Sequence, residues 1–192
     1  EAPLIEMAER LNVIIARGPE EDVLERFLIA ADQVKAQNIV RICGDNPLID
    51  RQLMRLLIHT HLKENTDYTV TSDSIPLGTG TEIVKVSALK KISSVTMQTK
   101  YREHVTTWFH DNPTLAVQSR VPAPVYLRNK SHRLTIDTGN DLTLMGKIFN
   151  EFYTLTSPLL DLQKVIQFLD THPDIAQINA NTPQKNWRSQ PK

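Results

Sequence analysis

The sequence predicts a three-layer α/β/α fold, in which helices cover both faces of a mainly parallel, mixed sheet. Over the first 65 residues, segments with helical spacing of apolar residues alternate with short runs rich in β-branched residues. Turn signals, R-G-P and G-D-N-P, follow the first two of these runs, as expected where crossover helices connect parallel strands. A chain of 192 residues with 40% hydrophobic content is long enough to bury a core of this kind.

The first elements follow from local patterns. Apolar residues at helical spacing predict a helix at 3–10, and the β-branched run that follows predicts a buried strand at 13–16. Acidic residues at 20–22 suit the start of the next helix, where the helix dipole favours negative charge. Asp50 is suited to cap the helix that follows the second strand.

The remaining elements are expected to be shorter. The expected strands are 13–16, 38–43, 68–71, 83–86, 115–121 and 134–137. The expected helices are 3–10, 20–34, 50–64, 88–92, 101–110, 141–152 and 160–171. We expect one α/β domain over 1–178 and, because 179–192 is polar and contains proline, a C-terminal tail.

Composition excludes several classes of function. The 22 basic and 22 acidic residues cancel, so no bulk charge favours nucleic acid or an anionic membrane. No apolar run reaches the roughly 18 residues of a membrane span, and no signal peptide opens the chain. A single cysteine, Cys43, excludes an internal disulfide and fits a reducing compartment, so we expect a cytoplasmic location.

One candidate site follows the second strand, at Gly44 and Asp45. Open α/β sheets bind ligands at the carboxyl ends of their strands, glycine lets the backbone approach a ligand, and a carboxylate can hold Mg2+. Alternatively, Asp45 simply organises the turn before Pro47.

A second candidate site lies about ninety residues later, where Asp137 ends the expected strand 134–137. Two carboxylates from separate strand ends would suit Mg2+ bound to phosphates. Alternatively, Thr138 or Asn140 caps the next helix and Asp137 is a loop residue.

Five segments, in the same order, resemble the cytidylyltransferases related to the spore-coat polysaccharide biosynthesis protein, which are kin to those for acylneuraminate and ketodeoxyoctonate. Residues 41–50 resemble R-x-x-G-D-x-P-L-x-D, and 17–26 resemble R-G-x-x-x-D-V-L-x-R. Residues 102–106 match R-E-H-V-T, 136–142 match V-D-T-x-x-D-L apart from Ile in place of Val, and 178–179 fall where that family closes.

This resemblance implies a nucleotide-diphospho-sugar transferase (glycosyltransferase-A-like) fold. It also implies the transfer of CMP from CTP to a sugar acid or sugar phosphate, with release of pyrophosphate. The reaction would belong to surface polysaccharide biosynthesis. It implies that Asp45 and Asp137 are the catalytic residues and hold Mg2+. The residues implied on the nucleotide side are Arg17, Gly18, Asp22, Arg26, Arg41 and Gly44. Those implied on the sugar side are Glu82, Glu103, His104 and Thr106. A homodimer is also expected.

The residues alone leave other roles open for these positions. Arg17 equally suits a solvated rim, and Arg26 suits an ion pair with Asp22 one helical turn away. Glu82 can face solvent from a strand, and His104 can be a partly buried, satisfied histidine.

Two departures from the family matter. The family opens with a β-α-β unit whose loop resembles R-x-x-S-x-R-L-P-x-K and wraps the triphosphate, and this sequence has no counterpart. We therefore expect an N-terminally incomplete domain that is inactive alone. Gly80 also stands where the family's substrate strand, G-x-D-V-E-V, has aspartate, although Glu82 is kept.

Two other functions compete with this one. A glycosyltransferase of the same fold that consumes a nucleotide-sugar would usually place its metal on a D-x-D triplet, and the sequence contains none. A non-catalytic or truncated module that binds sugar or supports assembly would also fit the missing loop.

Overall fold

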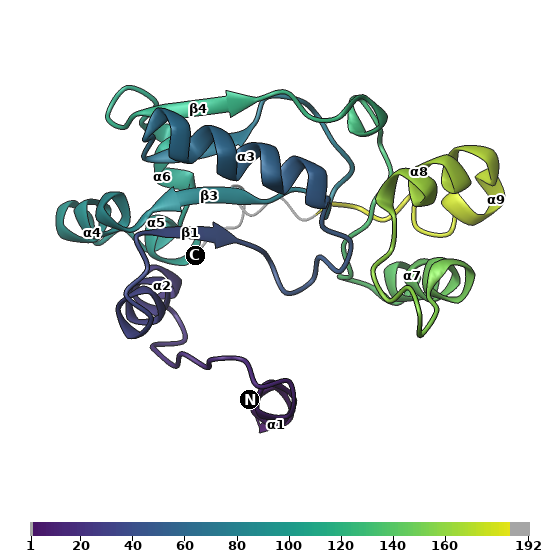
Figure 1. Cartoon of the computed structure of the whole chain (residues 1–192), viewed down its shortest axis with the longest axis horizontal. Coiled ribbons are helices and arrows are strands. Elements are labelled where there is room, and N and C mark those ends of the chain that lie inside the picture. The colour runs from purple at the N-terminus through teal and green to yellow at the C-terminus, as the bar shows by residue number, and fades with distance from the viewer. Residues whose placement is uncertain (1, 185–192) are drawn as a thin grey trace. The chain divides into compact units, whose positions relative to one another are not determined.

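The computed structural model describes residues 2–184 and confirms a mixed α/β fold (Figure 1). Four strands form one sheet in the order β1-β3-β2-β4, where β1 is Asn38–Arg41, β2 is Tyr68–Thr71, β3 is Glu82–Lys85 and β4 is Gln118–Val121. Strand β3 is antiparallel to both β1 and β2. Tyr68 N donates to Val117 O, and four residues further along both segments Ser72 N donates to Val121 O. Because the residue numbers increase in the same direction on both sides, β2 and β4 are parallel. The sheet is therefore mixed, as predicted, but it is not mainly parallel, because two of its three strand pairs are antiparallel.

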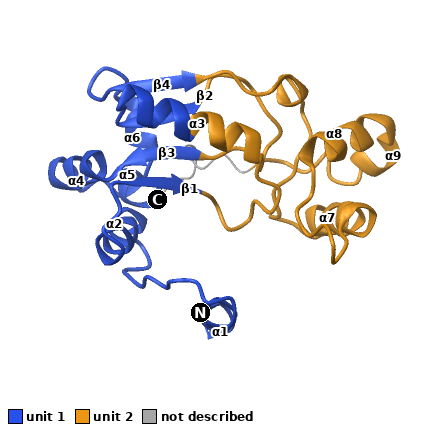
Figure 2. Ribbon diagram, viewed as in Figure 1, with its two compact units in different colours: residues 1–41, 58–70, 82–120 blue, residues 42–57, 71–81, 121–192 orange. Residues whose placement is uncertain are grey.

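The chain divides into two compact units (Figure 2). The first comprises 2–41, 58–70 and 82–120, and the second comprises 42–57, 71–81 and the described chain from 121 onward. The first unit contains α1 (Ala2–Arg10), α2 (Val23–Gln33), α4 (Val86–Val95), α5 (Thr99–Glu103) and α6 (Thr107–Asp111). The second contains the 3-10 helix η1 (Val125–Leu127), α7 (Gly139–Phe152), α8 (Leu162–Thr171) and α9 (Pro173–Ala176). Helix α3 (Arg51–Glu64) contributes a half to each unit.

In the first unit, alternation along the strands sends side chains to both faces of the sheet. Tyr68 and Val84 are paired across β2 and β3, and both belong to a buried cluster with residues of α2, α4 and α6. The next pair, Thr69 and Ile83, points to the opposite face, where His61 of α3 makes a 3.0 Å hydrogen bond to Thr69. Helices therefore cover both faces of the sheet.

The second unit is built mainly from helices and loops. Its buried side chains include Leu144, Met145 and Ile148 of α7 and Leu162, Val165, Ile166 and Leu169 of α8. Gly78 has a φ of +90°, and a Cβ at this position would lie 2.6 Å from the backbone of Leu134. The close approach allows Leu134 N to donate to Leu77 O at 2.7 Å, which joins two loops that are distant in sequence.

Two predicted strands are wrong. Residues 13–16 form no strand, and Val13 and Ile14 are 55% and 68% exposed, because no neighbouring strand among the described residues pairs with this segment. Residues 134–137 form no strand because their backbone groups bond to two different loops. Leu134 N donates to Leu77 O, and Ile136 N donates to Asp45 O, so no single ladder is built.

The predicted helix 101–110 is two short helices, α5 and α6, separated by non-helical backbone at His104. Helix α9, which begins at Pro173, and η1 were not predicted. Asp50 accepts a hydrogen bond from Leu53 N at 2.6 Å and so caps α3, as predicted. Of the expected tail, residues 185–192 lie outside the described part of the chain.

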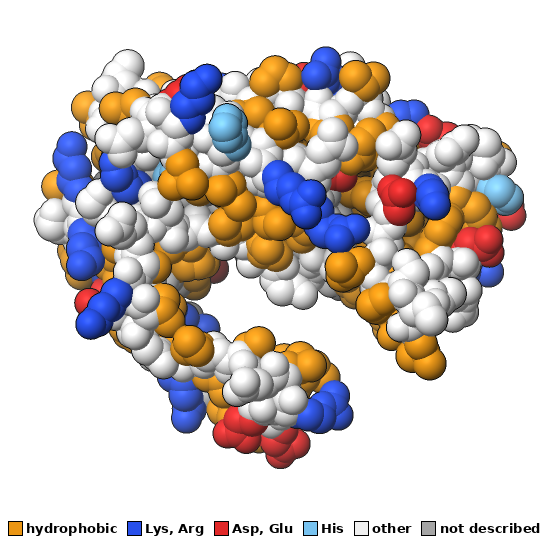
Figure 3. All heavy atoms as spheres, in the orientation of Figure 1, with side chains coloured by type: hydrophobic (Ala, Val, Ile, Leu, Met, Phe, Trp, Pro, Cys, Tyr) orange, Lys and Arg blue, Asp and Glu red, His pale blue; other side chains and the backbone are white. Residues whose placement is uncertain are grey.

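The surface is mixed in character. On the face shown in Figure 3, basic side chains are spread over several elements among acidic and apolar ones. Helix α1 buries none of its residues, and Leu4, Met7 and Leu11 are exposed. In the described chain, no helix has the length and apolar content needed to cross a membrane.

Candidate active site

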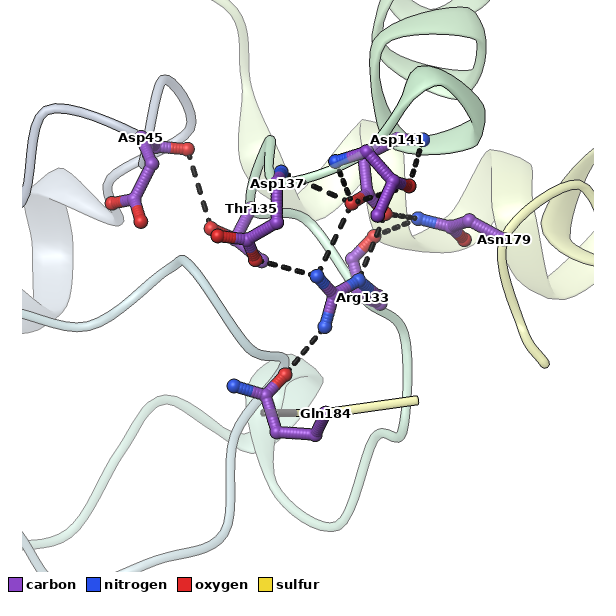
Figure 4. Close-up of polar contacts among 8 residues, drawn as sticks. Asp45, Arg133, Thr135, Asp137, Asp141, Asn179 and Gln184 are labelled. Atoms are coloured by element: carbon purple, nitrogen blue, oxygen red, sulfur yellow. Dashed lines mark hydrogen bonds and ion pairs between the residues drawn. The ribbon is translucent and has the colours of Figure 1, made fainter. Parts of the chain in front are cut away.

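In the second unit, the structure brings the two predicted aspartate segments together (Figure 4). The backbone carbonyl of Asp45 accepts hydrogen bonds from Ile136 N at 2.9 Å and from Thr135 Oγ1 at 3.4 Å. Asp137 is the next residue, so two aspartates about ninety positions apart lie on adjacent, hydrogen-bonded segments. The side chain of Asp45 is exposed, and no partner of its carboxylate occurs among the described residues.

Asp137 is held from below by a buried arginine (Figure 4). Arg133, whose side chain is 9% exposed, donates from Nη2 to Asp137 Oδ2 at 2.5 Å. The side chain of Asp137 remains 39% exposed, and its other oxygen, Oδ1, has no hydrogen-bond donor in the described part of the chain. Asp137 is therefore oriented by Arg133 while it keeps a carboxylate oxygen open to a ligand.

The second carboxylate on Arg133 has a different environment. Asp141 is completely buried, and Arg133 donates to its two oxygens at 2.8 and 3.1 Å. Asn179 Nδ2 adds a bond of 2.7 Å, and Thr138 adds two bonds, of 2.9 Å from its backbone and 3.0 Å from its hydroxyl, within the capping box of α7. Burial acts to raise the pKa of Asp141, but these donors, Arg133 first, outweigh it and hold the pKa well below its usual range. Asp141 therefore anchors the site structurally.

The donor set suits a hard cation. Mg2+ prefers carboxylate oxygens and keeps several water or phosphate ligands rather than an all-protein cage. Asp45 and Asp137 each offer an accessible carboxylate oxygen on neighbouring segments. No cluster of three or more His, Cys, Asp or Glu side chains that could hold a metal occurs within residues 2–184, so the other ligands of such an ion would be water and phosphate.

In the first unit, three predicted site residues, Arg41, Glu82 and Thr106, meet at one partly buried carboxylate. Glu82 of β3 accepts from Arg41 Nη1 at 2.7 Å and from Thr106 Oγ1 at 3.0 Å, both at Oε2. Its Oε1 accepts from the hydroxyl of Tyr68, which in turn lies 3.1 Å from His110 Nε2. Sequence reasoning did not identify Tyr68 or His110, because no local motif links residues this far apart along the chain.

This arrangement keeps Glu82 ionised. Burial, the largest single influence, would raise the pKa of Glu82. The neighbouring His110, the charge of Arg41 and the two hydroxyl donors together outweigh burial and lower the pKa of Glu82 to about 2. Burial and the adjacent carboxylate raise the pKa of Tyr68, so its hydroxyl stays protonated as a donor.

Glu82→Gln is expected to make the free energy of unfolding less dependent on pH below about pH 4.5. A glutamate whose pKa falls from 4.5 to about 2 on folding contributes stability that is complete above pH 4.5 and is lost as pH falls towards 2. Wild type should therefore lose at most about 3 kcal/mol more than Glu82→Gln over this window. Urea unfolding at several pH values measures the difference, and parallel curves would show that Glu82 is not held ionised.

The predicted nucleotide-side residues of α2 are also placed by internal contacts. Asp22 caps α2 by accepting a hydrogen bond from Glu25 N at 2.9 Å. Its other carboxylate oxygen, Oδ2, accepts a hydrogen bond from Arg102 Nε at 2.8 Å. Arg26 Nε donates to the carbonyl of Gly18 at 3.3 Å. The observed ion-pair partner of Asp22 is thus Arg102 of α5.

The other predicted residues are more accessible. Arg17 and Glu103 are exposed in the first unit, and His104, at the end of α5, is half-buried. In the second unit, a Cβ at Gly44 would meet no atom within 4 Å, so its backbone is open to approach.

Comparison with known proteins assigns a family. A family model described as cytidylyltransferase matches residues 4–177. An uncharacterized protein of Methanocaldococcus jannaschii is 37% identical over 185 residues, which cover 96% of this chain and 74% of that protein. A spore coat polysaccharide biosynthesis protein of Bacillus subtilis is 33% identical over 163 residues, which cover 84% of this chain and 67% of that protein.

A solved structure agrees with these matches. A cytidylyltransferase from Leptospira borgpetersenii superposes with a TM-score of 0.84 and 25% sequence identity, over 96% of this chain and 76% of that one. The sheet and its covering helices therefore have the fold of a known nucleotidyltransferase.

Proposed function

Because the chain belongs to the cytidylyltransferase family, we propose that it transfers CMP from CTP to a sugar acid or sugar phosphate and releases pyrophosphate. The similarity to a spore coat polysaccharide biosynthesis protein supports a role in the synthesis of surface polysaccharide. The observation that carries the proposal is the hydrogen-bonded pairing of the Asp45 and Asp137 segments.

In this proposal, Asp45 and Asp137 are the metal ligands. Mg2+ held by them would draw negative charge off the phosphates as pyrophosphate leaves. Arg133 keeps the Asp137 carboxylate in one orientation, and the open backbone at Gly44 leaves space for a phosphate. The family resemblance also assigns Arg17, an exposed residue of the first unit, to the nucleotide side.

The first unit supplies the proposed sugar side. Glu103 and His104 are accessible and would contact the acceptor. Glu82 accepts hydrogen bonds from both Thr106 and Arg41, so we give Glu82 and Thr106 a positioning role rather than direct contact with the acceptor. Asp22 and Arg26 likewise hold the start of α2 beside Gly18.

The proposal is tested by pyrophosphate release. The protein is incubated with one nucleoside triphosphate at a time, Mg2+ and a panel of sugar acids and sugar phosphates. We expect release from CTP that depends on both Mg2+ and one acceptor. Hydrolysis of CTP without any acceptor, or an equal rate with all four nucleotides, would contradict the proposed reaction.

A further inference from the structure

A cavity of about 270 Å³ lies in the first unit, lined by helices α4 and α6, by the loop that follows α6 and by the residue before β2. Its apolar floor consists of four buried members of the main core cluster: Ala88, Ile92, Trp108 and Phe109. The other lining residues are Asp67, Ser87, Lys91, Leu115 and Ala116. The volume lies just below the roughly 300–1,000 Å³ of drug-sized ligand sites, so the cavity suits a smaller ligand.

The cavity lies at the sheet edge opposite to Arg41 and Glu82. Asp67 directly precedes β2, and its carbonyl accepts a hydrogen bond at 2.9 Å from the backbone N–H of Lys85, the last residue of β3. The start of β2 and the end of β3 therefore meet at one edge of the sheet. Arg41 ends β1 and Glu82 begins β3, so this pair lies at the other edge, where the parallel strands have their carboxyl ends. The cavity is therefore not part of the site described above.

Three polar groups of the lining have unused hydrogen-bonding capacity. Trp108 is 7% exposed, yet its indole N–H donates to no acceptor in the described chain. Asp67 accepts from Val117 N at 3.0 Å through Oδ2, and its Oδ1 accepts from no donor among residues 2–184. Lys91 pairs with no described acid, Asp67 included, although both side chains line the cavity. Since a buried indole N–H usually has a partner, the lining indicates a ligand that provides an acceptor.

The lining selects a class of ligand. Its apolar floor suits a hydrocarbon or aromatic group, which would lose contact with water there. Lys91 attracts an anion and Asp67 attracts a cation, and because these two do not pair with each other, a ligand that carries both charges can bind both. A carboxylate oxygen would also accept from the indole N–H of Trp108. A zwitterion with an apolar side chain satisfies all of these groups at once.

We propose that this cavity binds a free α-amino acid with a large apolar side chain. The ammonium group of the ligand pairs with Asp67, and its carboxylate binds Lys91 and the indole N–H of Trp108. The side chain of the ligand packs on Ile92 and Phe109. The site does not depend on the proposed transfer of CMP, because it shares no residue with the predicted nucleotide, metal and sugar positions.

The first test uses the unmodified protein and a series of ligands. Protein labelled with 15N is titrated with L-phenylalanine and L-leucine up to about 10 mM, because dissociation constants on the order of 0.1–1 mM are expected for ligands of this size. Binding should shift the indole N–H resonance of Trp108, which Trp108→Phe identifies. Phenylalanine that lacks its ammonium group (3-phenylpropanoate) or its carboxylate (2-phenylethylamine) should bind about fivefold or more weakly.

The second test assigns each charge to a residue. In Lys91→Met, phenylalanine should lose its advantage over 2-phenylethylamine. In Asp67→Asn, whose amide oxygen can still accept from Val117 N, phenylalanine should lose its advantage over 3-phenylpropanoate. Lys90→Met is the matched control, because Lys90 is the exposed neighbour of Lys91 on α4 and does not line the cavity. Thermal unfolding confirms that the variants are folded.

Three results would overturn the assignment. The first is the absence of any shift with either amino acid. The second is equal binding of phenylalanine and both analogues, which would mean that the cavity takes only an apolar group. The third is an equal effect of Lys90→Met and Lys91→Met. The ligand series decides the question even if a variant fails to fold, and since no nucleotide or metal is present, its outcome is independent of CMP transfer.

Discussion

Replacement of Asp141 by Asn is expected to destabilise the protein by about 3 kcal/mol or more, whereas Asp137→Asn should cost less than about 1 kcal/mol. Both carboxylates bind Arg133, but Asp141 is completely buried and the Asp137 side chain is 39% exposed. An Asn at 141 would point an amide group towards donors from Thr138 and Asn179 and would remove the main counter-charge of a buried guanidinium.

The measurement is urea unfolding of wild type and both variants with EDTA present, so that metal binding does not contribute. Arg133→Met combined with Asp141→Leu should recover part of the loss, because the uncompensated buried charge is removed. Equal effects of the two single substitutions, or a cost below about 1 kcal/mol for Asp141→Asn, would show that Asp141 does not anchor the site.

Local pattern was sufficient to predict most elements of this fold. The strand at 68–71 and the amphipathic helices near 23–33 and 51–64 have strong periodicity, and the structure forms them. The two wrong strands have apolar, β-branched residues too, but a strand requires a neighbour, which a local pattern does not reveal. At 134–137 the neighbours are loops, so the same residues form isolated bonds.

The candidate site was predictable only in part. Asp45 and Asp137 stood out because each follows a hydrophobic run and begins a turn, and the structure places their segments side by side. Arg133 carries no such signal, and Asn179 was matched only by its place near the end of the family pattern. Their contacts with Asp141 span 8 and 38 residues, so no local pattern reveals them. The motif residue Asp141 matched the family pattern, but its burial beneath Arg133 is a property of the folded chain.

Asp45→Asn and Asp137→Asn are each expected to weaken divalent metal binding about tenfold or more in the presence of CTP, with little change in stability. Asp45 is fixed through its backbone carbonyl, which the substitution keeps, so the effect isolates the carboxylate. In any form of the enzyme that is active, the same substitutions should lower CMP transfer by about 100-fold or more, as loss of a group that stabilises developing charge does.

Mn2+ titration followed by water-proton relaxation measures the affinity, with Glu151→Gln as control because Glu151 is an exposed carboxylate on α7. A crystal structure with Mn2+ and CTP should place the Asp45 and Asp137 carboxylates roughly 4–6 Å apart on one ion, given metal–oxygen distances near 2.1 Å. Unchanged affinity in both variants, or carboxylates more than about 12 Å apart in that complex, would refute the shared-metal site. Weaker binding in Asp137→Asn alone would place the metal on the Arg133 side and leave Asp45 to organise its turn.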